Sequence, residues 1–328
     1  MSTARQRKKI LVTGGAGFIG SHVCEALTDA GHTVHCLDNF ATGKRENIAH
    51  LDGRKNFRLV PADIRVFTEV RKAVEGMDAV VHLAALGSVP RSIAEPMASE
   101  AANLTGFLHL LEACRAAGVH RVVYASSSSV YGDSATLPKR EGTEGRPLSP
   151  YAVTKAMDES YAGMYHRLFG LDAIGLRFFN VYGERQDPEG PYAAAIPRFL
   201  RSMLRGEAPT VFGDGRQTRD FTYVGNAVQA VVAALGTRDA RAPGGVFNVA
   251  YGRRTDLLEL LERLQSAVQE VRPDLEPMRP HHVEERAGDV RDSLADIGAA
   301  REVLGFEPEF SLDDGLARAV PWYVRHWG

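Results

Sequence analysis

Short apolar runs alternate with amphipathic stretches through the first half of the chain. Runs of strand length occupy residues 10–13, 34–37, 57–60, 79–83 and 122–125. Helical periodicity fills residues 20–30, 67–74 and 103–117, and Gly118 follows the last of these at a C-cap position. Strands that alternate with helices form βαβ units, so the pattern predicts a parallel sheet.

The second half of the chain is less regular. A helix over residues 151–169 and a strand over residues 173–178 continue the alternation, but prolines at 188, 191, 197 and 209 then interrupt it. Helical periodicity over residues 257–271 and 312–326 dominates the remainder. We therefore expect an α/β protein with a doubly wound parallel sheet in residues 1–182 and a smaller, mainly α C-terminal lobe in residues 183–328.

Composition narrows the classes of function. The 328 residues suffice for a large core, and 39 basic against 41 acidic residues give a net charge of −2, which favours neither a nucleic-acid nor a membrane surface. The basic residues at 5–9 precede a short apolar run without the pattern of a signal peptide, so we expect a soluble cytoplasmic protein. Cys24, Cys36 and Cys114 match no metal-ligand spacing; we expect core residues and no metal.

A glycine-rich turn follows the first strand and opens a helix. Gly14, Gly17 and Gly20 permit a tight turn and close backbone approach, so that a pyrophosphate can rest on the helix N-terminus. Asp38 ends the second strand, where a carboxylate accepts hydrogen bonds from the adenosine ribose and repels a 2′-phosphate. The turn and the carboxylate predict a Rossmann-type domain that binds NAD.

Residues at the carboxyl ends of the neighbouring strands are expected to line the same cofactor site, because ligands bind at that edge of open α/β sheets. With the first turn of the helix, these further candidates are Phe18, Ile19, Asn39, Asp63, Ile64, Leu83, Ala84 and Ala85.

A serine run and a Tyr-x-x-x-Lys pair form the candidate catalytic group. Residues 126–129 are all serine and end the fifth strand, while Tyr151 and Lys155 share one face of the next helix. An ammonium beside the phenol favours the phenolate, as a general base requires, and also lies within reach of the nicotinamide ribose. A serine hydroxyl can share the proton of a substrate alcohol.

With these motifs the chain resembles the extended short-chain dehydrogenase/reductases, and within their NAD-dependent epimerase/dehydratase family the UDP-hexose 4-epimerases. The resemblance spans nearly the whole chain and rests on Gly14, Gly17, Gly20, Asp38, Asp63, Asn103, Ser127, Tyr151, Lys155, Phe178, Phe179 and Asn180. It implies Tyr151 as the base, Lys155 as its modulator and ribose ligand, and Ser127 with Ser128 as hydroxyl partners. It also implies Asn103 and Phe178 as cofactor contacts. Which of the four serines leads stays open.

The resemblance further implies a UDP-sugar substrate and a homodimer. Two arginines, Arg219 and Arg286, suit a diphosphate because guanidinium groups match phosphate oxygens. Without the resemblance, each of them also fits a surface or ion-pair role. The implied contacts to UDP are Asn180, Tyr192, Ala193, Ala194, Val211, Gly213, Arg219, Arg286 and Asp289. Ser127, Ser128 and Ser129 would face the sugar, which turns about its UDP anchor while hydride leaves C4 for NAD and returns on the other face. The implied dimer forms through the helices over residues 103–117 and 151–169.

Small residues predict which sugar is preferred. Ser293 stands where galactose epimerases carry a large tyrosine beside C2 of the sugar, so a serine leaves room for an N-acetyl group. Gly87 and Ser88 belong to a segment that resembles the loop of UDP-N-acetylglucosamine 4-epimerases. We therefore expect UDP-GlcNAc and UDP-GalNAc as the better pair, with UDP-Glc and UDP-Gal weaker. The alternative is that Ser293 is only a small loop residue.

The sequence bears differently on three other functions. A 4,6-dehydratase needs an acid beside the tyrosine, and residues 127–129 offer only serines, which disfavours dehydration. A UDP-glucuronate decarboxylase shares the Ser, Tyr and Lys and remains the enzymatic alternative. A non-enzymatic NAD or nucleotide-sugar sensor has no need of an intact Tyr151 and Lys155.

Overall fold

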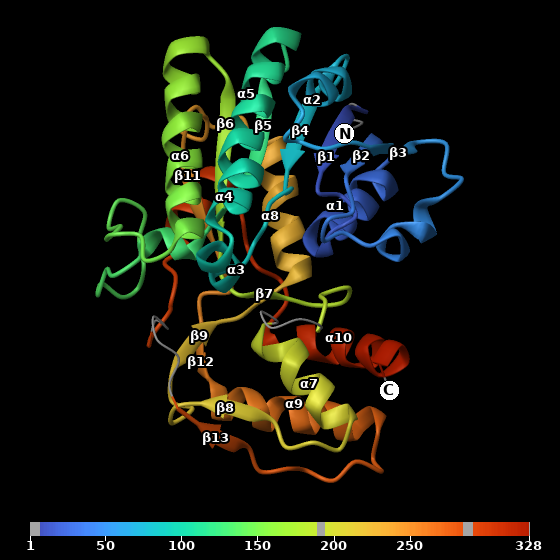
Figure 1. Ribbon diagram of the computed structural model, residues 1–328, viewed down its shortest axis with the longest axis vertical. Coiled ribbons are helices and arrows are strands. Elements are labelled where there is room, and N and C mark those ends of the chain that lie inside the picture. Colours follow the sequence, from blue (N-terminus) through green and yellow to red (C-terminus); the bar gives the residue numbers. More distant parts are fainter. Residues whose placement is uncertain (1–6, 189–193, 285–290, 328) are drawn as a thin grey trace.

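A seven-stranded, all-parallel sheet forms the centre of the larger lobe (Figure 1). The computed structural model describes residues 7–188, 194–284 and 291–327. The strands lie in the order β11 (Val246–Val249), β6 (Asp172–Phe178), β5 (Arg121–Ser127), β4 (Ala79–His82), β1 (Lys9–Thr13), β2 (Thr33–Asp38) and β3 (Phe57–Pro61). The expected parallel, doubly wound sheet is confirmed.

Helices cover both faces of this sheet. α1 (Phe18–Asp29) and α8 (Val224–Gly236) pack together on one face. On the other face lie α2 (Phe67–Val74), α5 (Gly106–Ala117) and α6 (Pro150–Phe169). Neighbouring strand residues point to opposite faces, so Val12 enters the core beneath α1 and Leu11 the core beneath α5. This two-sided burial explains why the strands are apolar runs rather than alternating ones.

The second lobe lies below the carboxyl edge of the sheet in Figure 1. Its core joins α7 (Ala195–Leu204), α9 (Leu257–Val271) and α10 (Leu312–Trp327). Three two-stranded pairs frame it, namely β7 (Val181–Tyr182) with β10 (Thr222–Tyr223), β8 (Thr210–Phe212) with β13 (His281–Val283), and β9 (Thr218–Asp220) with β12 (Arg254–Asp256).

The second lobe is discontinuous in sequence. After β10 the chain returns to the larger lobe, where α8 packs on α1 and β11 pairs with β6. α8 and β11 therefore pack with the larger lobe although they follow residue 182 in the chain. The four residues of β11 carry too short a signal to be separated from loop by periodicity.

Several elements agree closely with the sequence pattern. α2 and α9 have the expected bounds, and Gly118 ends α5 in the left-handed conformation at φ 69°. The expected helix over residues 103–117 instead begins with a one-turn π-helix, η3 (Ala101–Thr105). The short helices α3 (Val89–Ala94) and α4 (Pro96–Glu100) and the longer α7 and α8 were not expected.

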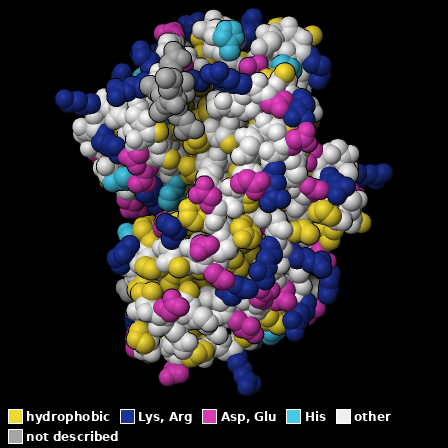
Figure 2. Space-filling view, turned by 180° about the vertical axis from the view of Figure 1, so that it is seen from behind, with side chains coloured by type: hydrophobic (Ala, Val, Ile, Leu, Met, Phe, Trp, Pro, Cys, Tyr) yellow, Lys and Arg dark blue, Asp and Glu magenta, His cyan; other side chains and the backbone are white. Residues whose placement is uncertain are grey.

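The surface and the cysteines agree with the composition. Figure 2 shows basic and acidic side chains interspersed over one whole face of the described chain. All three cysteines are buried thiols. No helix in the described part of the chain is both long enough and apolar enough to span a membrane. Within the same ranges, no three His, Cys, Asp or Glu side chains converge on a position that could hold a metal ion.

Candidate functional site

The glycine turn between β1 and α1 brings two backbones into contact. Gly14 has φ 68°, and a Cβ at this position would lie 2.6 Å from the backbone N of Ala84. A Cβ at Gly20 would lie 2.0 Å from the carbonyl oxygen of Gly14. Only glycine fits at either position, so the turn closes tightly and leaves the start of α1 open to a ligand.

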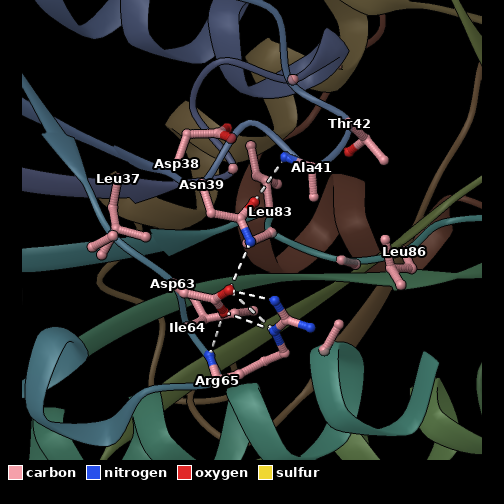
Figure 3. Close-up of a pocket in the computed structure, with 16 residues that line it drawn as sticks. Leu37, Asp38, Asn39, Ala41, Thr42, Asp63, Ile64, Arg65, Leu83 and Leu86 are labelled. Atoms are coloured by element: carbon pink, nitrogen blue, oxygen red, sulfur yellow. Dashed lines mark hydrogen bonds and ion pairs between the residues drawn. The ribbon is translucent and has the colours of Figure 1, made fainter. Parts of the chain in front are cut away.

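A pocket lies at the carboxyl edge of the sheet, around the ends of β1 to β4 (Figure 3). The structure brings together there Gly14, Gly17, Asp38, Asn39, Asp63, Ile64, Leu83, Ala84 and Ala85, all of them predicted cofactor contacts. The rest of the lining is Leu37, Ala41, Thr42, Ala62, Arg65, Leu86 and Ala102.

Two backbone N–H groups hold the Asp38 carboxylate in place. The side chain is 6% exposed; Oδ2 accepts a hydrogen bond from the N–H of Ala16 at 2.9 Å, and Oδ1 accepts one from the N–H of Phe40 at 2.8 Å. A carboxylate oxygen can accept more than one hydrogen bond, so both oxygens keep capacity for a ligand hydroxyl. This arrangement fits a ribose diol and opposes a phosphate.

Arg65 is a pocket residue that sequence reasoning missed. Its Nε and Nη2 donate to the Asp63 carboxylate at 3.0 and 2.6 Å, and the Asn39 amide donates to the same carboxylate at 2.9 Å (Figure 3). The Arg65 hydrogen bond holds the pKa of Asp63 well below its usual range. Asp63 is therefore a fixed acceptor at the pocket wall. The only signal in the sequence was an arginine two residues after the aspartate.

The four serines after β5 have different environments. Ser126 is buried and donates to Glu159 on α6 at 2.5 Å, which removes it from the substrate side. Ser127 caps the short helix η4 (Ser128–Tyr131), because its Oγ accepts from the N–H of Ser129 at 3.2 Å. Ser127 and Ser128 are both half-buried. The structure thus reduces the open choice to the residues after Ser126.

Tyr151 and Lys155 lie on the first turns of α6. Ser149 caps this helix by accepting from the N–H of Ala152 at 3.1 Å, and the N–H of Tyr151 donates to Ser92 Oγ at 3.0 Å. These contacts fix Tyr151 at the helix start, against the short helix α3 that carries Ser92.

Lys155 is a buried ammonium, only 2% exposed. Its Nζ donates to the carbonyl of Ala125 at 2.9 Å and to Asp158 at 3.2 Å. Burial acts to lower the pKa of Lys155, but Asp158 and Tyr151 outweigh it, so that this pKa lies above its ordinary value. The lysine therefore stays charged and acts on the tyrosine through its field.

Four other predicted cofactor residues do not line this pocket in the structure. Asn103, fully buried in η3, accepts from the N–H of Leu86 at 2.7 Å and donates to Thr154 at 3.3 Å, so it anchors the loop after β4. Phe178 is 9% exposed at the end of β6. Phe18 and Ile19, at the start of α1, pack against the apolar core of the second lobe.

A second pocket lies within the second lobe, between β7, α7, β8 and β9. Predicted substrate contacts Asn180, Ala194 and Arg219 line it, together with Tyr182, Arg198, Phe212 and Gln217. Asn180 has φ 35° and its amide donates to the carbonyl of Asp220 at 3.1 Å. Tyr192, Ala193, Arg286 and Asp289 lie outside the described residues.

Val211 and the residue after it point to opposite sides of β8. Its side chain is fully buried in the core of the second lobe, and its neighbour Phe212 lines the pocket instead. The reason is the alternation of β8, which turns successive side chains to opposite faces. Gly213 follows at φ 71°, and its N–H donates to the carbonyl of Val283 at 2.8 Å.

Ser293 lies beside the strand that carries Arg219. Its N–H donates to the carbonyl of Thr218 at 3.1 Å, and the N–H of Ala295 donates to Asp220 at 3.2 Å. Ser293 and Arg219 are therefore held together by one short segment of backbone pairing.

The predicted loop residues after β4 differ in role. Ser88 caps α3, since its Oγ accepts from the N–H of Arg91 at 3.2 Å. A Cβ added at Gly87 would meet nothing within 4 Å, so this position has room for a larger side chain.

Comparison with known proteins agrees with this geometry. The NAD dependent epimerase/dehydratase family matches residues 10–250. A UDP-glucose 4-epimerase of Mycolicibacterium smegmatis is 38% identical over 323 residues, 96% of this chain and 98% of that protein. A UDP-N-acetyl-alpha-D-glucosaminuronate decarboxylase of Bacillus cytotoxicus is 34% identical over 327 residues, 97% of this chain and 98% of that protein.

Two solved structures show the same fold over the full length. The UDP-N-acetylglucosamine 4-epimerase of Methanobrevibacter ruminantium, in complex with UDP-N-acetylmuramic acid, has a TM-score of 0.91 and 37% identity, covering 98% of this chain and 99% of that one. The UDP-glucuronic acid 4-epimerase of Bacillus cereus, in complex with UDP-glucuronic acid and NAD, has a TM-score of 0.87 and 34% identity, covering 97% and 99%. The chain belongs to the NAD-dependent epimerase/dehydratase family, and its cofactor is NAD.

Proposed function

We propose that this protein is an epimerase that inverts C4 of a UDP-hexose, with UDP-GlcNAc and UDP-GalNAc as its better substrates. The observation that carries the proposal is the order of the strands. β5, which bears the serines and accepts the Lys155 hydrogen bond, lies between β4, beside the cofactor pocket, and β6, which leads into the second pocket.

The cofactor pocket fits NAD on this chain's own contacts. Gly14 lets the turn after β1 lie directly against the backbone of Ala84 at the pocket wall, and the Asp38 oxygens would accept ribose hydroxyls and repel a phosphate. Asp63 and Arg65 would line the adenine side, and Lys155 would bond the nicotinamide ribose. When bound, NAD supplies a hydride acceptor and donor, so that a secondary alcohol can be oxidised and re-formed with no second redox substrate.

The side chains at the end of β5 and the start of α6 would move the proton. Tyr151, held beside the charged Lys155, accepts the proton of the 4-hydroxyl group and later returns it. Ser127 or Ser128 shares that proton by hydrogen bonding. Asn180 and Arg219 hold the UDP portion in the second pocket, which leaves the sugar free to turn between two faces.

The sugar preference rests on two small residues: Ser293, which pairs with Thr218 next to Arg219, and Gly87, where a Cβ would meet nothing within 4 Å. The relative solved with UDP-N-acetylmuramic acid supports a pocket that admits a substituent at C2. Relatives named for uronates and for a decarboxylase make UDP-glucuronate decarboxylation the second candidate.

A panel of UDP-sugars separates the candidates. The holoprotein is incubated with UDP-GlcNAc, UDP-Glc, UDP-glucuronate and UDP-N-acetylglucosaminuronate, with NMR reading the configuration at C4 and a separate assay for carbon dioxide. We expect inversion of UDP-GlcNAc and slower inversion of UDP-Glc. Release of carbon dioxide from a uronate, or inversion confined to uronates, would contradict the proposal.

A further inference from the structure

Asp158 is a buried acid beside the catalytic lysine that the proton transfer described above does not use. It lies three residues after Lys155 on α6, and the side chains of the pair are 1% and 2% exposed. Its Oδ2 accepts the Lys155 ammonium at 3.2 Å, whereas Oδ1 is buried and has no hydrogen-bond partner among the described residues. A buried carboxylate with an unsatisfied oxygen is costly, so its presence calls for a compensating role.

The geometry around Lys155 indicates that role. An ammonium group has three N–H donors. Two of them are used inside the protein, one on the Ala125 carbonyl at 2.9 Å and one on Asp158. Because these two acceptors fix the rotation of the amine, the direction of the third donor is also fixed. That donor is the one available for a ligand hydroxyl.

We propose that Asp158 is a positioning residue that keeps Lys155 charged and aims its remaining N–H, and that Tyr151 depends on it for activation. The inference rests on the proposed function, in which Tyr151 is the base. A fully buried ammonium without a counter-charge gives up its proton. Asp158 is the strongest of the charges that oppose this loss.

The other ionisable groups around the pair cannot take over this role. His82 on β4 is neutral, because burial and then Lys155 lower its pKa to about 3. Burial raises the pKa of Tyr124 on β5 well above its ordinary value, so it is neutral too. Glu159 on α6 is bound to Arg177 on β6 at 2.8 Å through both of its oxygens. Tyr151 itself changes charge during the reaction.

The pair has a pH dependence with a definite sign. Burial raises the pKa of Asp158 to about 6, although Lys155 acts to lower it. Asp158 therefore takes up a proton as the solution becomes mildly acidic, in a range where an exposed aspartate stays ionised. Below about pH 6 Asp158 is neutral and no longer supplies a counter-charge, while Lys155 stays an ammonium, so the surroundings of the amine change without a change in its own charge.

The test observes Lys155 directly rather than through turnover alone. The chain has seven lysines, so selective ε-¹³C labelling of the NAD-loaded protein gives a small set of signals, and Lys155→Met assigns the one of interest. In the native protein we expect this signal to respond to pH near 6 as Asp158 titrates, and to remain that of an ammonium in alkaline solution. In Asp158→Asn we expect Lys155 to lose its proton at lower pH than in the native protein. The kcat for the UDP-sugar should fall by roughly tenfold while KM changes by less than about twofold.

The control is an exposed ion pair with the same (i, i+3) spacing along a helix. Glu112 and Arg115 on α5 form an (i, i+3) pair with side chains 38% and 43% exposed, so Glu112→Gln should leave both the lysine titration and kcat unchanged. An unchanged Lys155 titration in Asp158→Asn overturns the inference. If Asp158→Asn does not fold, a native Lys155 signal that is indifferent to pH around 6 overturns it equally. Failure of every UDP-sugar in the panel would instead count against the proposed function, because the lysine titration does not require turnover.

Discussion

At the scale of single residues, the site combines one exposed reacting group with several buried supports. Tyr151 is half-buried at the helix start, whereas Lys155, Asp158 and Asn103 have exposed fractions of at most 2%. Side chains fixed in this way hold the proton acceptor in place before substrate arrives, which lowers the cost of reorganisation during the reaction. Changes at Tyr151 should therefore affect chemistry more than folding.

The first residue-scale prediction concerns Tyr151→Phe. The substitution removes the phenol oxygen and leaves the ring and the hydrogen bond from the backbone N–H to Ser92 in place. We expect kcat to fall by roughly 10²- to 10⁴-fold, the usual contribution of a general base, while the purified variant still carries NAD. Steady-state kinetics and the absorbance of released cofactor check this. Turnover close to that of the native enzyme would exclude Tyr151 as the base.

The second residue-scale prediction tests the sugar preference. In Ser293→Tyr a bulky ring would lie on the segment that pairs with Thr218, next to Arg219. We expect kcat/KM for UDP-GlcNAc to fall by about tenfold or more, about 1.4 kcal/mol, because steric exclusion acts on the larger sugar. UDP-Glc should change by less than about threefold. Equal losses for both sugars would show that Ser293 does not act as a size filter, and Ser293→Ala serves as the matched small variant.

At the scale of elements, Arg177 connects parts of the chain that lie far apart in sequence. This 3%-exposed guanidinium binds Glu159 on α6 through two hydrogen bonds and also contacts Glu144 and the hydroxyl of Tyr131 in η4. Tyr131 in turn donates to Asn248 on β11 at 2.7 Å. The cluster therefore joins β6, α6, β11 and η4, the short helix that contains Ser128 and Ser129.

The prediction at this scale is a loss of stability in Arg177→Met. The substitution leaves Glu159, whose side chain is 13% exposed, without its partner; breaking a fully buried pair costs about 3–5 kcal/mol, so we expect a loss of about 2–4 kcal/mol here. The midpoint of urea unfolding should shift accordingly. Arg241 offers a control, because its ion pairs with Asp239 and Glu302 are more than half exposed on the arginine side, at 57%. Arg241→Met should change the free energy of unfolding by less than about 0.5 kcal/mol. A loss at Arg177 as small as this would mean that the cluster is not structurally important.

The same elements show what the sequence could and could not predict. The turn at Gly14, the acid at Asp38 and the Tyr151 to Lys155 spacing are local patterns, and the structure brings Gly14 and Asp38 into one pocket as expected. The Arg177 cluster and the place of β11 depend on contacts between residues up to 117 positions apart, such as Tyr131 with Asn248, which no local pattern encodes. The side to which Val211 points could not be predicted either, because β8 has only three residues, too few for its alternation to indicate a face.

At the scale of the whole molecule, apolar side chains remain exposed on neighbouring helices of the larger lobe. Met97 on α4 is 78% exposed, Ile93 on α3 is 63% exposed, and Leu168 and Phe169 at the end of α6 are 67% and 50% exposed. α3 lies against the start of α6, whereas Leu168 and Phe169 lie at its end, so the exposed apolar side chains are distributed along this helix. Exposed apolar groups of this kind favour association with a partner surface.

We expect that partner to be a second copy of the chain, joined through α5 and α6 about a two-fold axis. At a two-fold interface each residue occurs once on each subunit, so one charged substitution introduces two charges into the interface. Light scattering of the native protein at working concentration should give the mass of a dimer, twice 35.7 kDa. Leu168→Glu should shift the mass toward the monomer, because it places two unpaired carboxylates in an apolar contact. Val271→Glu, at a 38%-exposed position on α9 in the other lobe, should leave the mass unchanged. If light scattering gives the native protein the mass of a monomer, the prediction of a dimer is wrong. If the dimer persists in Leu168→Glu but dissociates in Val271→Glu, the interface lies on the C-terminal lobe at α9 and not on α6.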